Sequence, residues 1–286
     1  MFYTETRDGA VNITASQAIV NGISEDGGLY VPSSFPKLSP DDIDALRHLD
    51  YKELAAEIIS KFLDFDRDEL KKYCDAAYSR FDTDEVCPVV KTDEGTFILE
   101  LFHGPTLAFK DVALTLLPHL LTASAKKVGL DKKILILVAT SGDTGKAALE
   151  GFRDVDGTRV TVLYPEEGVS EMQKLQMRTQ EGNNVAVIGI KGNFDDAQSA
   201  VKRIFTDERM AGKLSDKGYV LSSANSINWG RLVPQIVYYF HAYLELVRKG
   251  EIKTGDKINF AVPSGNFGDI LAGYYAKQTH MRQQQQ

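Results

Sequence analysis

From residue 91 onward, short apolar runs alternate with longer helical patterns, and this alternation limits the possible folds more than any other feature. The runs are rich in β-branched residues and have the length of strands that are buried on both faces of a parallel sheet. They span residues 134–139, 160–163, 185–190, 219–221 and 258–262. The helical patterns cover residues 112–127, 145–153, 170–180, 194–209 and 232–249. We therefore predict an α/β fold of parallel sheets with helices, in which ligands bind at the carboxyl ends of the strands.

The first 90 residues have a different pattern, rich in turns and then in helix starts. Ser39 precedes Pro40 and two acidic residues, which suits the N-cap and first turn of a helix. Asp66 opens a second helix, with Glu69 in place to bond back to the cap. We expect residues 41–78 to be mostly helical. Because no polar groups converge there, the region is predicted to be a scaffold.

Composition and charge exclude several classes of function. The 286 residues suit about two domains, and a net charge of −7 offers no basic field for a nucleic acid. The longest apolar run, residues 134–139, is far shorter than the roughly 20 residues of a membrane span. The N-terminus has no signal or transit pattern, so a cytoplasmic protein is expected. Cys74 and Cys87 are predicted to be buried thiols without metal-ligand spacing, and no metal site is expected.

Two of the predicted strands run directly into a Ser-Gly turn that opens a helix. Residues 134–139 lead to Ser141 and Gly142, and residues 258–262 lead to Ser264 and Gly265. Such a turn offers free backbone amides, a hydroxyl group and the positive end of a helix dipole, which together bind anions. One turn of this kind is also compatible with a simple tight connection. The occurrence of two favours two anion sites.

Two further segments carry polar groups that chemistry could use. Residues 222–231 place hydroxyl and amide side chains ahead of Arg231, whose planar fork suits a phosphate or carboxylate. A helix cap with one solvated arginine is the alternative reading of that segment. The second segment, residues 103–111, places Lys110 after a Gly-Pro turn, between Phe109 and Asp111. A partly desolvated amine at a helix start is a usable nucleophile or base, although a single lysine there is usually a surface residue.

One activated lysine and three anion sites together suit a pyridoxal phosphate enzyme that acts on a doubly anionic substrate. Here the sequence resembles a known family. The motifs of threonine synthase, a fold-type II pyridoxal phosphate enzyme, are similar to residues 103–111 (HGPTLAFKD), 140–145 (TSGDTG), 225–231 (NSINWGR) and 264–269 (SGNFGD). Residues 3–7 and 27–32 also resemble the N-terminal domain of that family.

The resemblance implies a tryptophan synthase β-like fold with a mostly helical N-terminal domain. Its divisions are an N-terminal domain at residues 1–90, an incomplete catalytic α/β region at 91–277 and a tail unlike the family at 278–286. Since the family continues well beyond this point, the chain is expected to be truncated at the C-terminus and to turn over slowly unless completed.

The resemblance also assigns roles residue by residue. Lys110 matches the lysine that forms a Schiff base with the cofactor. The loop around the cofactor phosphate is matched by Gly265, Asn266, Phe267, Gly268 and Asp269. The loop for the substrate α-carboxylate is matched by Ser141, Asp143 and Thr144. The positions that hold the substrate's own phosphate are matched by Asn225, Ser226 and Arg231, with help from Asn266.

The implied activity is the conversion of O-phospho-L-homoserine and water into L-threonine and phosphate, in threonine biosynthesis. Lys110 would take the Cα proton, and Arg231 would stabilise charge on the departing phosphate. The expected partner is a small-molecule substrate, with no nucleic acid and no membrane, and the oligomeric state is left open. Two alternatives stay open: a related lyase that eliminates phosphate from O-phosphothreonine, and a non-catalytic fragment that binds the cofactor or phosphate.

Overall fold

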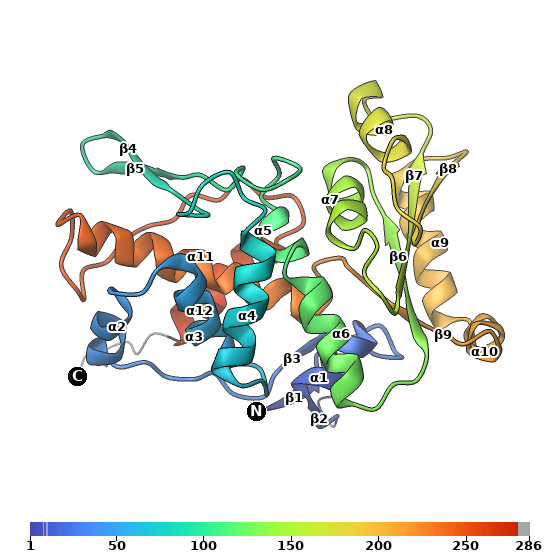
Figure 1. The fold of residues 1–286 in the computed structure, drawn as a ribbon, viewed down its shortest axis with the longest axis horizontal. Helices are drawn as coiled ribbons and strands as arrows, with labels where there is room; N and C mark the ends of the chain where they lie inside the picture. Colours follow the sequence, from blue (N-terminus) through green and yellow to red (C-terminus); the bar gives the residue numbers. More distant parts are fainter. Residues whose placement is uncertain (8, 10, 280–286) are drawn as a thin grey trace.

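The computed structural model of the chain describes residues 1–7, 9 and 11–279 (Figure 1). The prediction of an unrelated tail at residues 278–286 falls almost entirely outside this part. Within it, no helix combines the length and the apolar character needed to cross a membrane.

A four-stranded parallel sheet lies where the alternating pattern predicts it. Its strands are β6 (Lys133–Ala139), β7 (Thr158–Pro165), β8 (Val185–Ile190) and β9 (Tyr219–Ser222), in the order β8-β7-β6-β9. All three pairings are parallel, and the central pairing aligns Val138 with Val162. Most side chains of β6 and β7 are buried, as expected for strands covered on both faces.

Helices cover both faces of this sheet. They are α7 (Asp143–Gly151), α8 (Glu171–Arg178), α9 (Phe194–Thr206) and α10 (Glu208–Asp216). Figure 1 shows the sheet nearly edge-on, with α7 on one side and α9 on the other. The prediction of one helix over 194–209 is wrong at its end. Asp207 has extended backbone angles that end α9, and its side chain caps α10 by accepting from the amides of Arg209 and Met210.

The fifth predicted strand, residues 258–262, is also not found. This segment makes no ladder with any strand of the described residues. Instead it lies along the long helix α11 (Trp229–Arg248), where Phe260 meets Tyr239 edge-on at 4.9 Å between ring centroids and Ile258 packs near Leu246. Only Ile258 and Val262 of this segment are half-buried, and Phe260 remains 45% exposed.

The N-terminal region contains the expected helices α2 (Pro40–Leu46), α3 (Tyr51–Ser60) and α4 (Arg67–Tyr78). Ser39 and Asp66 cap α2 and α4 as predicted, but Glu69 accepts from the Tyr73 hydroxyl instead of bonding back to the cap. The sequence patterns do not reveal a small antiparallel sheet that packs beside them. It consists of β1 (Phe2–Glu5), β2 (Ile13–Thr14) and β3 (Tyr30–Pro32), with α1 (Ala15–Asn21) following β2.

One hydrophobic core joins the N-terminal region to the rest of the chain, and α11 runs through it. Trp229, at the start of α11, is 2% exposed and meets the rings of Tyr3, Phe62 and Tyr275. The remaining elements around α11 are the hairpin β4 (Val89–Asp93) and β5 (Thr96–Leu99) and the helices α5 (Asp111–Leu114), α6 (Leu117–Lys127) and α12 (Gly268–Thr279). Cys74 and Cys87 are buried in this core as unbridged thiols, as predicted, and burial raises the pKa of each to about 12.

Candidate active site

The starts of four helices meet at one place, and each carries residues that the sequence singles out. Lys110 at the start of α5 lies 2.7 Å, measured from Nζ to Oδ2, from Asp143 at the start of α7. Asp143 is in turn close enough to Arg231, in the first turn of α11, to act electrostatically on it. At the start of α12, a Cβ placed on Gly268 would lie 2.7 Å from Cβ of Ser226, in the loop before α11. The structure therefore brings the four predicted segments together.

The turn before Lys110 is fixed by the buried carboxylate of Asp111. Its oxygens accept from the Thr106 amide at 2.7 Å and from the Thr106 hydroxyl at 2.6 Å. A Cβ on Gly104 would lie 2.4 Å from Cβ of Asp111, so only glycine allows this approach. Leu107 adopts a positive φ of 58° within the turn. Burial raises the pKa of Asp111, whereas the bonds from Thr106 lower it. The sequence marks Asp111 only as a neighbour of Lys110, and its positioning role was missed.

The side chain of Lys110 is mostly buried, with 13% of it exposed. Its nitrogen donates to Asp143 Oδ2 and lies 4.3 Å from the centre of the Phe109 ring. An anion and an aromatic face therefore meet the same ammonium group, and both attract a cation.

The turn at residues 140–145 is held by a single buried hydroxyl group. Oγ1 of Thr140 accepts from the amides of Gly142 at 3.1 Å and Gly145 at 3.0 Å. The amides of Asp143 and Thr144, at the N-terminus of α7, have no hydrogen-bond partner within the described part of the chain. These are the free donors that an anion site at a helix N-terminus requires.

Arg231 is a buried cation that the protein satisfies only in part. Arg231 is 3% exposed, and its Nη1 donates to the carbonyl of Ala224 at 2.7 Å. Nε is buried and has no partner among the described residues. Burial lowers the pKa of Arg231 to about 10, against the opposing effect of Asp143, so the group remains charged at neutral pH. A buried, half-bonded guanidinium fits an anion as its missing partner.

The turn at residues 264–269 presents a second set of free amides. Oγ of Ser264 donates to the Asp269 carboxylate at 2.5 Å and accepts from the Phe267 amide at 3.1 Å. The amides of Gly265 and Gly268 have no partner in the part of the chain that the structure describes. Phe267 has a positive φ of 57° and is 63% exposed, so the turn stands at the surface.

The loop before α11 is anchored by Asn228, which the sequence analysis left without a role. Its Oδ1 accepts from the Gly230 amide at 2.8 Å, and Nδ2 donates to the carbonyls of Ser223 at 2.9 Å and Ile19 at 3.0 Å. This cap leaves the side chains of Asn225 and Ser226 without hydrogen-bond partners among the described residues. The alternative of a helix cap in residues 222–231 is therefore correct for Asn228, but its solvated arginine is wrong because Arg231 is buried.

His103 does not face the lysine site. Its ring nitrogens pair with Asp82 at 2.7 Å and Glu100 at 2.9 Å, and its ring stacks on Phe102. The bonds to Glu100 and then Asp82 raise its pKa. Over the described residues, no group of histidine, cysteine and acidic side chains has the arrangement of a metal site.

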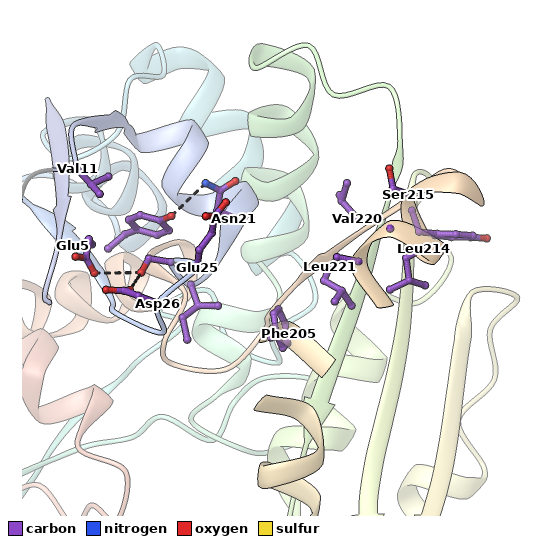
Figure 2. Close-up of a pocket in the computed structure, with 16 residues that line it drawn as sticks. Glu5, Val11, Asn21, Glu25, Asp26, Phe205, Leu214, Ser215, Val220 and Leu221 are labelled. Atoms are coloured by element: carbon purple, nitrogen blue, oxygen red, sulfur yellow. Dashed lines mark hydrogen bonds between the residues drawn. The ribbon is translucent and has the colours of Figure 1, made fainter. Parts of the chain in front are cut away.

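A cavity of about 750 Å³ lies elsewhere, between the N-terminal sheet and the segment from α9 to β9 (Figure 2). Figure 2 shows Glu5 and Asp26 on one wall, both bonded to Ser24, and Leu214 and Val220 on the other. Among the described residues, its lining shares no member with the cluster around Lys110 and includes no lysine or arginine for a phosphate. The cluster at the four helix starts, which contains Lys110 and Arg231, is therefore the better candidate for an active site.

Comparisons with known proteins agree with the motifs. Residues 2–78 match the family model "Threonine synthase N terminus". The chain is 41% identical to threonine synthase of Schizosaccharomyces pombe, over 96% of this chain and 54% of that protein. It is 42% identical to human threonine synthase-like 1, over 92% of this chain and 36% of that protein. The chain thus spans about half the length, or less, of the curated relatives it matches.

Solved structures show the same fold. Pyridoxal phosphate-bound threonine synthase of Brucella melitensis is 42% identical, with a TM-score of 0.86 over 98% of this chain and 58% of that one. Threonine synthase of Escherichia coli is 36% identical, with a TM-score of 0.85 over 98% of this chain and 61% of that one. The predicted α/β fold of the fold-type II enzymes is therefore confirmed.

Proposed function

Because the chain is a relative of the threonine synthases along nearly its whole length, we propose that it acts as a threonine synthase. The reaction would convert O-phospho-L-homoserine and water into L-threonine and phosphate. The observation that carries the proposal is Arg231, a buried cation with an unpartnered nitrogen, close to the carboxylate that pairs with Lys110. A site with one amine and several anion-binding groups suits a substrate that carries both a carboxylate and a phosphate.

The site fits pyridoxal phosphate as its cofactor, the molecule bound in the Brucella melitensis structure. Lys110 would form the covalent bond to the cofactor aldehyde. The turn from Gly265 to Asp269, with free amides at a helix N-terminus, would hold the cofactor phosphate. When bound, this cofactor supplies an electron sink that stabilises the negative charge left when a proton leaves Cα of the substrate.

The start of α7 would bind the substrate α-carboxylate. The free amides of Asp143 and Thr144 point to the anion site of a helix N-terminus, and the hydroxyls of Ser141 and Thr144 add donors beside it. The side chain of Asp143 carries a negative charge and is already paired with Lys110. Its backbone amide is therefore the group that suits a carboxylate.

Arg231 would bind the phosphate of the substrate, together with the side chains of Asn225, Ser226 and Asn266. As the bond to that phosphate breaks, negative charge grows on the departing group, and the buried guanidinium stabilises it without reorganising. The same burial makes this interaction stronger than one in bulk water.

Lys110 would move the protons of the reaction. Once its nitrogen is free, the amine can take the proton from Cα and return it at a later position. The Asp111 network fixes the turn that carries this lysine, which keeps the amine in one place during both transfers.

The proposal is tested by measuring phosphate release from O-phospho-L-homoserine and from O-phosphothreonine by the same preparation. We expect release from phosphohomoserine, and we expect Arg231→Ala to lower its kcat/KM by a factor on the order of 10 to 100, since a charge-assisted hydrogen bond is lost. Arg209→Ala, at a side chain that is 90% exposed, is the matched control and should change nothing. Faster release from phosphothreonine would favour the related lyase, and loss of the cofactor spectrum in Arg231→Ala with unchanged kinetics would contradict the role of Arg231.

A further inference from the structure

The ion pair between Lys110 and Asp143 is unusual because it restrains the one amine that the site needs as a nucleophile. Lys110 Nζ lies 2.7 Å from Asp143 Oδ2, and the lysine side chain is far less exposed than the aspartate side chain, 13% against 51%. The carboxylate therefore comes from the solvent side and covers the inner, better buried amine. The ion pair holds the nitrogen against the carboxylate, so a carbonyl group can approach the nitrogen only after this contact is broken.

A second contact acts in the same direction. The Phe109 ring lies 4.3 Å from Lys110 Nζ, and an aromatic face attracts the ammonium form but not the neutral amine. The other nearby charges do not compete for the lysine. Asp111 turns its carboxylate back to Thr106, and Arg231 is a cation that interacts electrostatically with Asp143.

We propose that Asp143 is a positioning residue that, together with the Phe109 ring, holds the Lys110 nitrogen in place and restrains it from attacking carbonyl groups. The restraint ends when a ligand takes the place of the carboxylate. That this restraint slows attachment of the cofactor rests on the function proposed above. The restraint itself does not depend on that function.

The restraint is measured by competitive labelling of the whole chain with a small amount of acetic anhydride at pH 7. A neutral amine attacks one carbonyl group, an amide forms, acetate leaves and the amine proton passes to the buffer. Mass spectrometry of the digest gives the labelling rate of Lys110 relative to Lys72, an exposed lysine in α4 of the same molecule.

We expect Asp143→Asn to raise the relative labelling rate of Lys110 about fivefold, the effect of a partly screened ion pair. Phe109→Leu should raise it about twofold to fivefold through loss of the ring. Asp143→Glu should stay within about twofold of the natural chain, because the charge is kept. Asp195→Asn, an exposed aspartate in the first turn of α9, is the matched control and should have no effect.

Unchanged labelling of Lys110 in both Asp143→Asn and Phe109→Leu would overturn the proposal. If Asp143→Asn loses the circular dichroism spectrum of the natural chain, Phe109→Leu and Asp143→Glu decide the outcome. A second arm adds pyridoxal phosphate and follows its absorbance, where Asp143→Asn should form the bond faster than the natural chain. If no variant bonds the cofactor but labelling changes as expected, the proposed function fails and the restraint stands.

Discussion

The two Ser-Gly turns of the molecule share a sequence pattern but differ in what supports them. The turn at residues 140–145 follows β6, which pairs with β7 on one side and β9 on the other. The turn at residues 264–269 follows a segment without a strand partner in the described chain. The first is built around the buried Thr140 hydroxyl, and the second around Ser264 near the surface.

This difference shows that the free amides of a Ser-Gly turn and the rigidity of that turn have separate causes. Free amides at a helix start come from the local sequence, so both turns have them. Rigidity comes from the strand that leads into the turn and from the side chains packed around it. We therefore expect the turn at residues 140–145 to be more rigid than the turn at residues 264–269. We therefore expect substitutions in residues 140–145 to affect the stability of the fold, and matched substitutions in residues 264–269 to affect it little.

The largest difference is expected between valine substitutions at the two glycines. A Cβ on Gly145 would lie 2.5 Å from Thr140 Cγ2 and 2.9 Å from Val162 Cγ1, whereas a Cβ on Gly265 meets nothing within 4 Å. Gly145→Val should lower the free energy of unfolding by about 3 kcal/mol through overpacking, and Gly265→Val by less than about 0.5 kcal/mol. Urea denaturation of both variants gives the values. Equal losses would remove the distinction between the turns.

The hydroxyl groups give a smaller difference. Thr140→Val leaves two buried amides without their acceptor and should cost about 2 kcal/mol, whereas Ser264→Ala frees one amide near solvent and should cost less than about 1 kcal/mol. The same denaturation experiment measures both. A Ser264→Ala variant as unstable as Thr140→Val would show that the second turn is as rigid as the first.

The smallest expected effect is the stabilisation of the chain by an anion that binds at Arg231. Inorganic phosphate at about ten times its Kd should stabilise the chain by about 1 kcal/mol, seen as a rise in Tm over chloride of equal ionic strength. Arg231→Met should abolish the rise, and Arg209→Met, at an exposed site, should keep it. Burial lowers the pKa of Arg231 only to about 10, so the guanidinium stays charged across the neutral range and the rise should be the same at pH 7 and pH 8.5. A rise that survives in Arg231→Met would place the anion at one of the turns alone.

Local patterns predicted the parallel sheet and the helix caps well because their causes lie close in sequence. Residues 185–190 form a strand with the predicted bounds, and Ser39 caps α2. Residues 258–262 failed because an apolar β-branched run forms a strand only where a neighbouring strand pairs with it, and no strand of the described residues does so. The N-terminal sheet was missed for a similar reason, since β2 has only two residues and depends on its pairing with β1.

For the site, the sequence identified the chemical groups but not their contacts. Lys110, Asp143 and Arg231 were all singled out, yet Asp143 was assigned to a carboxylate, and its ion pair with Lys110 depends on how α5 and α7 pack. The roles of Asp111 and Asn228 were less visible, because the sequence does not show that Asp111 turns back to Thr106 or that Asn228 bonds to Ile19, far away in the chain.

The account depends most on Lys110 as the residue that bonds the cofactor, and reductive trapping tests this directly. The chain is incubated with pyridoxal phosphate, reduced with borohydride and digested, and the modified peptide is identified by mass spectrometry. We predict one dominant adduct, on Lys110, which is lost in Lys110→Ala while the circular dichroism spectrum is kept. A dominant adduct on any other lysine, or equal labelling of Lys110 and the exposed Lys72, would contradict the account.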